Sequence, residues 1–298
     1  MPIEIRWTVS LSASCIYAAD VLRRGRRLVD ARLSEAVGEP ARHLISDCEA
    51  AGLNNDRFWR QLLPLSARIE NNRQLVETAI KKSMGPNHQA GTAVERLAGC
   101  IADLELAVGR EMPDILDEVS VGASHLMEPW NARGENLLRG IGLITDERLM
   151  VTGAEVSLVY PAGQGGGHAA LLHNCALIEA VSTDLVAELP EWLRLTWLIS
   201  QLNIDVPIFS ENIAMAHRPL VASLAMLPAT LAAAERVELL RCTPETMTTA
   251  LKTWRVTGPA QIDLADLLLN WWETYESTRP AWSVALAALE QMVWPNGK

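Results

Sequence analysis

The sequence predicts a mainly α-helical protein with a multi-helix core and one small β-sheet, and three observations support that fold class. Apolar residues recur at helical spacing along most of the 298-residue chain. Hydrophobic residues make up 49% of it, which is enough to build a sizeable core. Strand-like patterns occur only near the N-terminus and around residues 141–160. We therefore expect a single helical domain over residues 1–298, whose one point of subdivision would be near 85–92.

The small sheet is predicted from two segments. A strand is expected over residues 2–11, because apolar and polar side chains alternate strictly from Ile3 to Leu11, as is typical of a half-buried strand. Between residues 148 and 160, two short apolar runs flank a turn that contains Gly153, so a β-hairpin is expected there. Residues 141–144 would add a third strand. Such a sheet needs a covered face, so we expect helices to pack against it.

Helices are expected through the rest of the first half of the chain. Gly38 should end the first of them, and Pro40 suits the first position of the next, which Gly52 would stop. The strongest pattern is a single apolar stripe at a spacing of three and four residues, formed by Val94, Leu97, Ile101, Leu104 and Val108. The expected helices of this half cover residues 16–36, 40–52, 65–84 and 94–108, and a further helix is expected from Pro113. A helix-breaking loop is expected at residues 85–88.

The second half is expected to be helical from about Gly166 almost to the end. Residues 169–189 form a long apolar stretch, and Pro190 opens a helix that is apolar around most of its circumference. Thr243, Pro244 and Glu245 combine a capping hydroxyl, a proline at the first helical position and an early acid. Another helix is expected to begin at about residue 211, to be interrupted at Pro219 and to end near Pro228. Two more are expected over residues 261–276 and 280–293.

Charge argues against a nucleic-acid partner. The chain is acidic, with a net charge of −10, and protein affinity for nucleic acid comes largely from Lys and Arg. The one basic cluster is Arg23, Arg24, Arg26 and Arg27. We interpret this cluster as a solvated helix end. Alternatively, it could bind a phosphate group or an acidic partner. Nucleic-acid binding would require these arginines to lie within a larger basic face.

The cysteines predict a reduced, cytoplasmic protein. The five of them lie at least 33 residues apart, without the spacing of a zinc site. They are therefore expected to be free thiols, not disulfides. The segment Leu11–Cys15 resembles a lipoprotein cleavage site, but the residues before it lack a positive region. No apolar run is long enough for a membrane span, so no membrane association is expected.

The glycine-rich segment from Gly163 to His168 is the candidate ligand site. We expect it to join a strand to a helix, where successive N–H groups of Gly163, Gly165, Gly166 and Gly167 could hold a phosphate or carboxylate. It departs from the phosphate-binding and dinucleotide-binding patterns, because His168 stands where either pattern needs another residue. The alternative is a loop that serves only to connect the two elements. His168 is the one candidate for a catalytic role, by proton transfer.

Neither a metal site nor a cofactor is predicted. His168 and His173 would lie about 140° apart around a helix, and His168 and Cys175 would lie about 10 Å apart along its axis, so neither pair could chelate one ion. No hydrolase signature is present. Glu179 and Asp184 are expected to be exposed on the polar face of a helix, because unpaired acids are rarely buried.

Two functions follow from these observations. The first is a non-catalytic helical protein that binds a protein partner or self-associates, which an exposed apolar patch bearing some of the ten tryptophans would favour. The second is an enzyme or binding protein for a small anionic ligand at Gly163–His168, which a concave pocket at that loop would favour. The tryptophans themselves are expected to pack mainly in the core.

Overall fold

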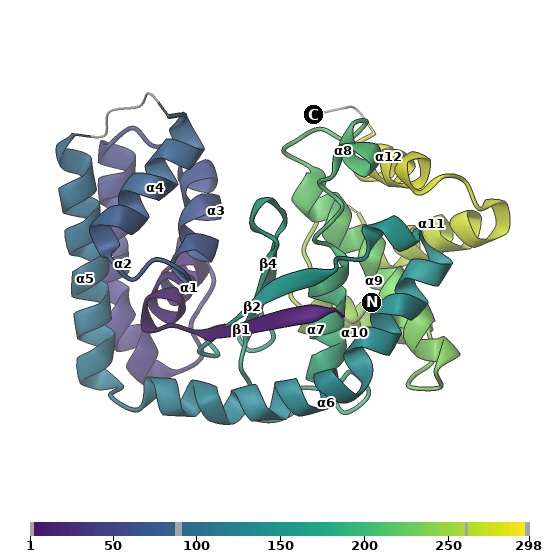
Figure 1. Cartoon of the computed structure of the whole chain (residues 1–298), viewed down its shortest axis with the longest axis horizontal. Helices are drawn as coiled ribbons and strands as arrows, with labels where there is room; N and C mark the ends of the chain where they lie inside the picture. The colour runs from purple at the N-terminus through teal and green to yellow at the C-terminus, as the bar shows by residue number, and fades with distance from the viewer. Residues whose placement is uncertain (1–2, 87–90, 260–261, 296–298) are drawn as a thin grey trace.

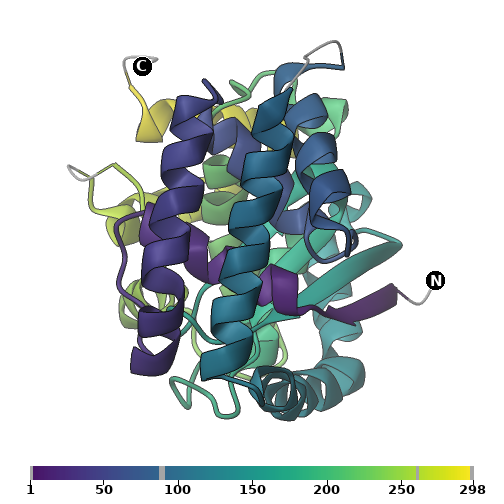
Figure 2. The same cartoon turned by 90° about the vertical axis from the view of Figure 1, so that its left-hand side faces the viewer.

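A computed structural model describes residues 3–86, 91–259 and 262–295 of the chain. Helices predominate, and a small sheet lies between two groups of them, so the mainly α fold with a minor sheet is confirmed (Figure 1). The first group comprises α1 (Leu11–Arg23), α2 (Ala31–Ala50), α3 (Asn55–Leu65), α4 (Asn72–Met84) and α5 (Thr92–Glu111). Helices α2 and α5 lie side by side on its outer face (Figure 2).

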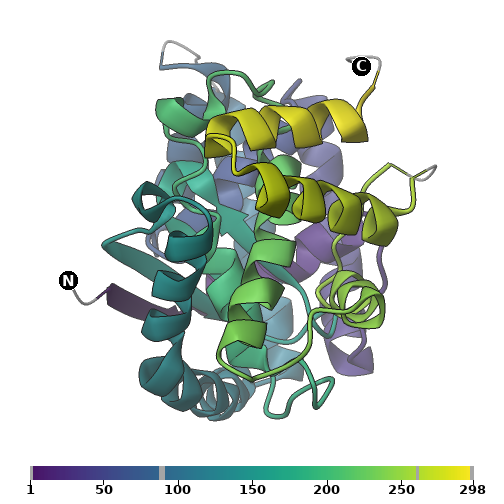
Figure 3. The same ribbon diagram turned by 90° about the vertical axis from the view of Figure 1, so that its right-hand side faces the viewer.

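A long helix, α6 (Ile115–Ile144), connects this group to the second one (Figure 1). The second group comprises α7 (Glu191–Ser200), α8 (Pro207–Ser210), α9 (Arg218–Arg236), α10 (Pro244–Thr253), α11 (Leu264–Thr278) and α12 (Trp282–Val293). Helices α11 and α12 cover its outer side (Figure 3). Single 3₁₀ turns occupy Glu147–Leu149 and Leu171–His173.

The sheet has four strands in the order β1-β2-β4-β3. Strands β1 (Glu4–Val9), β2 (Gly153–Val159) and β4 (Cys175–Glu179) are parallel, while β3 (Gly167–Ala170) runs antiparallel to β4. The expected N-terminal strand is thus confirmed. The expected hairpin at 141–160 is wrong, because only β2 lies there and residues 141–144 end α6. A central parallel strand pairs with distant segments and is covered on both faces, so its apolar run resembles half of a hairpin.

The expected helix over 169–189 is also wrong. This stretch contains β3, a 3₁₀ turn, β4 and a loop. A short apolar run in a central strand cannot be distinguished from a buried helix by periodicity alone. The glycine-rich loop therefore joins two strands, β2 and β3, and does not lead into a helix.

Helix boundaries in the first half differ from the prediction in two places. Helix α3 lies where no helix is predicted, and the helix predicted over residues 65–84 begins only at Asn72, the start of α4. The other difference concerns α1 and α2. The chain breaks between α1 and α2, at residues 24–30, while Gly38 and Pro40 lie inside α2. The side chain of Asp30 caps α2 by accepting the N–H groups of Arg32 and Leu33. The buried stripe of α2 continues across the glycine and proline, so packing outweighs the two local breakers. Likewise Pro228 lies inside α9 and does not end it.

Other expectations of the sequence are met. All five residues of the α5 stripe are buried. Every tryptophan is buried or half-buried, and four aromatic residues of α11 and α12 form one cluster: Trp271, Trp272, Tyr275 and Trp282. All five cysteines are free thiols. Within the described residues, no helix is both long and apolar enough to cross a membrane. Of the expected breaker at 85–88, residues 87 and 88 lie outside the described residues.

Candidate functional site

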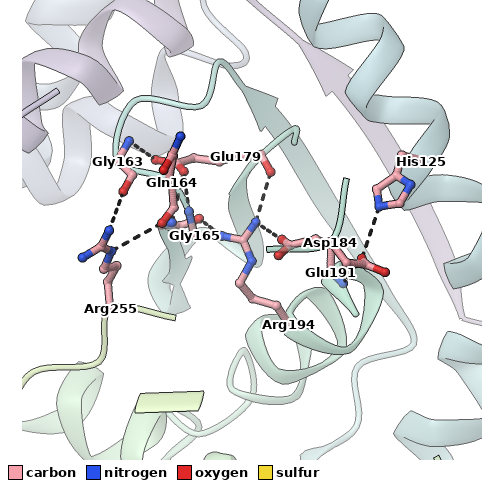
Figure 4. A network of polar contacts seen from close by, with 10 residues as sticks. His125, Gly163, Gln164, Gly165, Glu179, Asp184, Glu191, Arg194 and Arg255 are labelled. Atoms are coloured by element: carbon pink, nitrogen blue, oxygen red, sulfur yellow. Dashed lines mark hydrogen bonds and ion pairs between the residues drawn. The ribbon is translucent and has the colours of Figure 1, made fainter. Parts of the chain in front are cut away.

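The glycine loop encloses a carboxylate that belongs to the chain itself. Glu179, the last residue of β4, accepts backbone N–H groups from Gly163 at 2.6 Å, Gly165 at 2.8 Å and Gly166 at 3.1 Å (Figure 4). Its exposed fraction is 1%. The loop thus holds an anion, as its composition suggested, but the anion is internal and leaves these three donors occupied. The expected exposure of Glu179 is wrong, whereas Asp184 is exposed as expected.

Packing around the carboxylate explains why the loop is rich in glycine. Gly165 has a φ of +101°, and a Cβ atom there would lie 2.2 Å from the carbonyl oxygen of Thr253. A Cβ atom on Gly166 would lie 2.1 Å from the hydroxyl oxygen of Tyr17 and 2.9 Å from Oε1 of Glu179. Burial and the Glu179 carboxylate raise the pKa of Tyr17, so its phenol stays protonated. Any larger residue would separate the loop from these groups.

Two arginines hold the loop from either side (Figure 4). Arg194 of α7 is fully buried, donates to the carbonyl oxygens of Gly166 and Glu179, and forms an ion pair with Glu191. Burial raises the pKa of Glu191, although the Arg194 charge opposes that effect. This buried arginine fixes the position of the loop relative to the end of β4.

The second of these arginines is Arg255, which follows α10. Its guanidinium donates to the carbonyl oxygens of Gly163 at 3.1 Å and Gln164 at 3.4 Å. Arg26 in turn donates to the Arg255 carbonyl oxygen at 3.5 Å. Because both guanidinium partners of Arg255 are neutral carbonyl groups, its positive charge is not neutralised by them. Three segments far apart in the sequence, the α1–α2 loop, the glycine loop and the end of α10, therefore meet here.

Three adjoining hollows open beside this meeting point. The central hollow, of about 570 Å³, lies between α1, α3, β3 and α7. The α10 hollow, of about 840 Å³, adjoins it at Tyr17, Arg26, Gly166 and Arg255. The α3 hollow, of about 290 Å³, adjoins it on the other side at Arg60, His168 and Pro219. All three are in or near the size range of small-molecule sites.

The three hollows are rich in cations for a protein of net charge −10. Five arginines and two aspartates line the central hollow, and three arginines, a lysine and one aspartate line the α3 hollow. Three arginines, a lysine and three acids line the α10 hollow. Seven of the cations have no carboxylate within 4.0 Å among the residues that the structure describes. They are Arg26, Arg27, Arg57, Arg60, Lys82, Lys252 and Arg255.

His168 occupies the boundary between the central and α3 hollows. Burial, followed by the charge of Arg24, lowers its pKa to about 4. The imidazole is therefore neutral at pH 7, when one ring nitrogen can donate and the other can accept a hydrogen bond. His173 lines the α3 hollow too, where its Nε2 is 2.8 Å from Oε1 of Gln61.

The geometry separates the residues that the sequence grouped as metal candidates. His168 lies on β3, His173 in a 3₁₀ turn and Cys175 on β4, instead of on one helix. Across the described part of the chain, no three His, Cys, Asp or Glu side chains are grouped so as to hold a metal ion.

Sequence reasoning missed the convergence of the basic residues. The cluster from Arg23 to Arg27 does lie at the end of α1, as expected, and it was the only local signal. Arg60 and Arg255 join it through tertiary contacts alone. Comparisons with protein-family models, with curated proteins and with solved structures found no match for this chain.

Proposed function

We propose that this protein binds a small anionic ligand, one that carries phosphate or carboxylate groups, in the cleft formed by the three hollows. The observation that supports this proposal is a set of seven cations that line the cleft and have no carboxylate partner among the described residues, in an otherwise acidic protein. Like charges brought together repel one another, and an anion between them removes that repulsion. Guanidinium groups also match the oxygens of phosphate and carboxylate with paired hydrogen bonds.

The donors for this ligand are side chains. Because Glu179 occupies the N–H groups of Gly163, Gly165 and Gly166, the glycine loop supplies walls of the cleft and a fixed scaffold. Gly167 and His168 line the central hollow, and in this proposal the neutral imidazole donates one hydrogen bond to the ligand. In an enzyme, the same imidazole would be the group for proton transfer.

Binding of a protein partner, the other function considered from the sequence, has less support. Its expected sign was an exposed apolar patch with tryptophan, and none of the ten tryptophans is exposed. The exposed large apolar residues include Val121, Leu143 and Val237. Single exposed apolar side chains are common on monomeric proteins.

The test is binding of phosphate, sulfate, nucleotides, sugar phosphates and carboxylates, measured by thermal shift and calorimetry. A ligand that binds only the folded state must raise the melting temperature. We expect at least one anion to do so, and Arg60→Ala to weaken its binding by about ten-fold or more. Arg133→Ala, which removes an exposed arginine of α6 outside the cleft, is the matched control. If no anion binds the wild-type protein, the proposal is wrong.

A further inference from the structure

The unpaired cations of the central hollow lie at its two ends. Arg60 stands at the boundary with the α3 hollow, while Arg26 and Arg255 stand at the boundary with the α10 hollow. The α3 and α10 hollows share no lining residue, so they adjoin the central hollow at different places. The central hollow therefore has two separate positions at which an anionic group would find unpaired guanidinium groups.

The other two arginines of the central hollow line neither of the adjoining hollows, and both are already neutralised. Arg23 lies 2.9 Å from a carboxylate oxygen of Asp20 and 2.9 Å from one of Asp56, and Arg24 lies 2.7 Å from Asp20. The lining that belongs to the central hollow alone also includes apolar side chains: Trp59, Leu63, Trp197, Leu198, Leu220 and Trp254. Within the described ranges of the chain, this part of the hollow presents no unpaired charge, so it suits an uncharged group.

Acidic residues near the two ends leave this pattern in place. At the α3 end, Asp205 is paired with Arg218 at 2.8 Å. At the α10 end, Glu179 is held by the glycine loop, and Asp263 accepts the first N–H groups of α11. Asp266 also lines the α10 hollow, where it is exposed to solvent like Arg26, Lys252 and Arg255, so the cations at this end outnumber it.

We infer that the ligand is an elongated small molecule with an anionic group at each end and an uncharged middle. This inference rests on the proposed function and names its ligand class. One phosphate or carboxylate contacts Arg60, with His168 beside it, and the other contacts Arg26 and Arg255. The uncharged middle lies against the apolar wall, in a hollow whose volume of about 570 Å³ is typical of small-molecule sites.

A series of alkane-α,ω-bisphosphates with spacers of increasing length tests the inference by calorimetry. When both ends bind, the second binding event becomes intramolecular. We expect affinity to peak at one spacer length, at least ~100-fold above an alkyl monophosphate. Arg60→Ala and Arg255→Ala should each lower that peak by ten-fold or more and flatten the dependence on length. Arg133→Ala should leave the series unchanged.

Arg255 also holds the glycine loop, so Arg26→Ala provides a second variant at the same end, and melting curves show whether each variant is folded. If monophosphates bind but spacer length has no effect, the inference is overturned and the proposed function stands. If no member of the series or of the anion panel binds, both fail. Tighter binding of linear polyphosphate or of an oligothymidylate than of every bisphosphate would also overturn the inference, because these ligands are charged along their whole length.

Discussion

The carboxylate of Glu179 lies 2.6 Å from the backbone nitrogen of Gly163, sixteen positions earlier in the chain. With the N–H groups of Gly165 and Gly166, this contact turns the glycine loop into an anion-binding nest that is filled by the protein itself. The nest therefore stabilises the end of β4 and the wall of the cleft. In the proposed function, an external anion is bound by the arginine side chains near the nest and not by the nest itself.

Glu179→Gln should destabilise the fold by about 3 kcal/mol. The substitution removes a charged acceptor and turns an amide donor toward backbone N–H groups that need an acceptor. Urea denaturation measures the loss, with Glu188→Gln, at an exposed position, as the control. Equal unfolding midpoints for Glu179→Gln and wild type would show that the nest contributes no stability.

Arg194→Met should cost about 3–5 kcal/mol, because it leaves the buried Glu191 carboxyl group without its partner, either charged or forced to take up a proton. Adding Glu191→Gln removes the uncompensated charge, so the double variant should recover part of the loss. Denaturation of the wild type, both single variants and the double variant gives the coupling energy. Simple additivity of the two losses would contradict a buried ion pair at this place.

Gly166→Ala should destabilise the protein because the new methyl group would lie 2.1 Å from the Tyr17 hydroxyl oxygen. Overpacking of this kind costs about 1–3 kcal/mol. Tyr17→Phe in the same chain removes that oxygen and should recover part of the loss. Gly38→Ala, on the open face of α2, should instead stabilise the protein by about 0.5–1 kcal/mol. Equal effects of Gly166→Ala in the presence and absence of the Tyr17 hydroxyl would contradict the contact.

Acidification should destabilise the protein through His168 and His173. The pKa of each histidine is lowered to about 4, mainly by burial. The second cause is the positive charge of Arg24 for His168 and that of Lys82 for His173. An unfolded chain binds these protons near pH 6.5, so it holds more protons than the native state between pH 6.5 and 4. The contribution of the neutral imidazoles is complete above pH 6.5 and is lost as the pH falls to about 4, by up to roughly 3 kcal/mol each.

Unfolding free energies of wild type and His168→Asn, measured from pH 7.5 to 4, test this expectation. The variant should lose less stability than the wild type over that range. The same substitution at His43, which is exposed on α2, is the control and should retain the wild-type pH dependence. Parallel curves for His168→Asn and wild type would show that the imidazole of His168 takes up its proton without cost in the native state.

Local pattern determined a substantial part of this fold. The strand predicted over residues 2–11 contains β1, the stripe from Val94 to Val108 predicts α5, and the tryptophans pack mainly in the core as expected. Each of these features depends on which side chains repeat along one element, and hydrophobic periodicity records that directly. Composition also indicates the glycine loop as a candidate ligand site, but it does not indicate that Glu179 of the chain itself occupies the loop.

Tertiary structure decided the rest. The parallel pairing of β2 with β1 and β4 joins residues up to about 150 positions apart, and nothing in the β2 segment itself specifies those partners. That pairing buries Glu179 against the loop, which gives the loop an internal anion. It also helps to bring Arg26, Arg60 and Arg255 to one cleft. Charges from three distant segments combine into a site only when the chain has folded, because their interaction depends on distances in space.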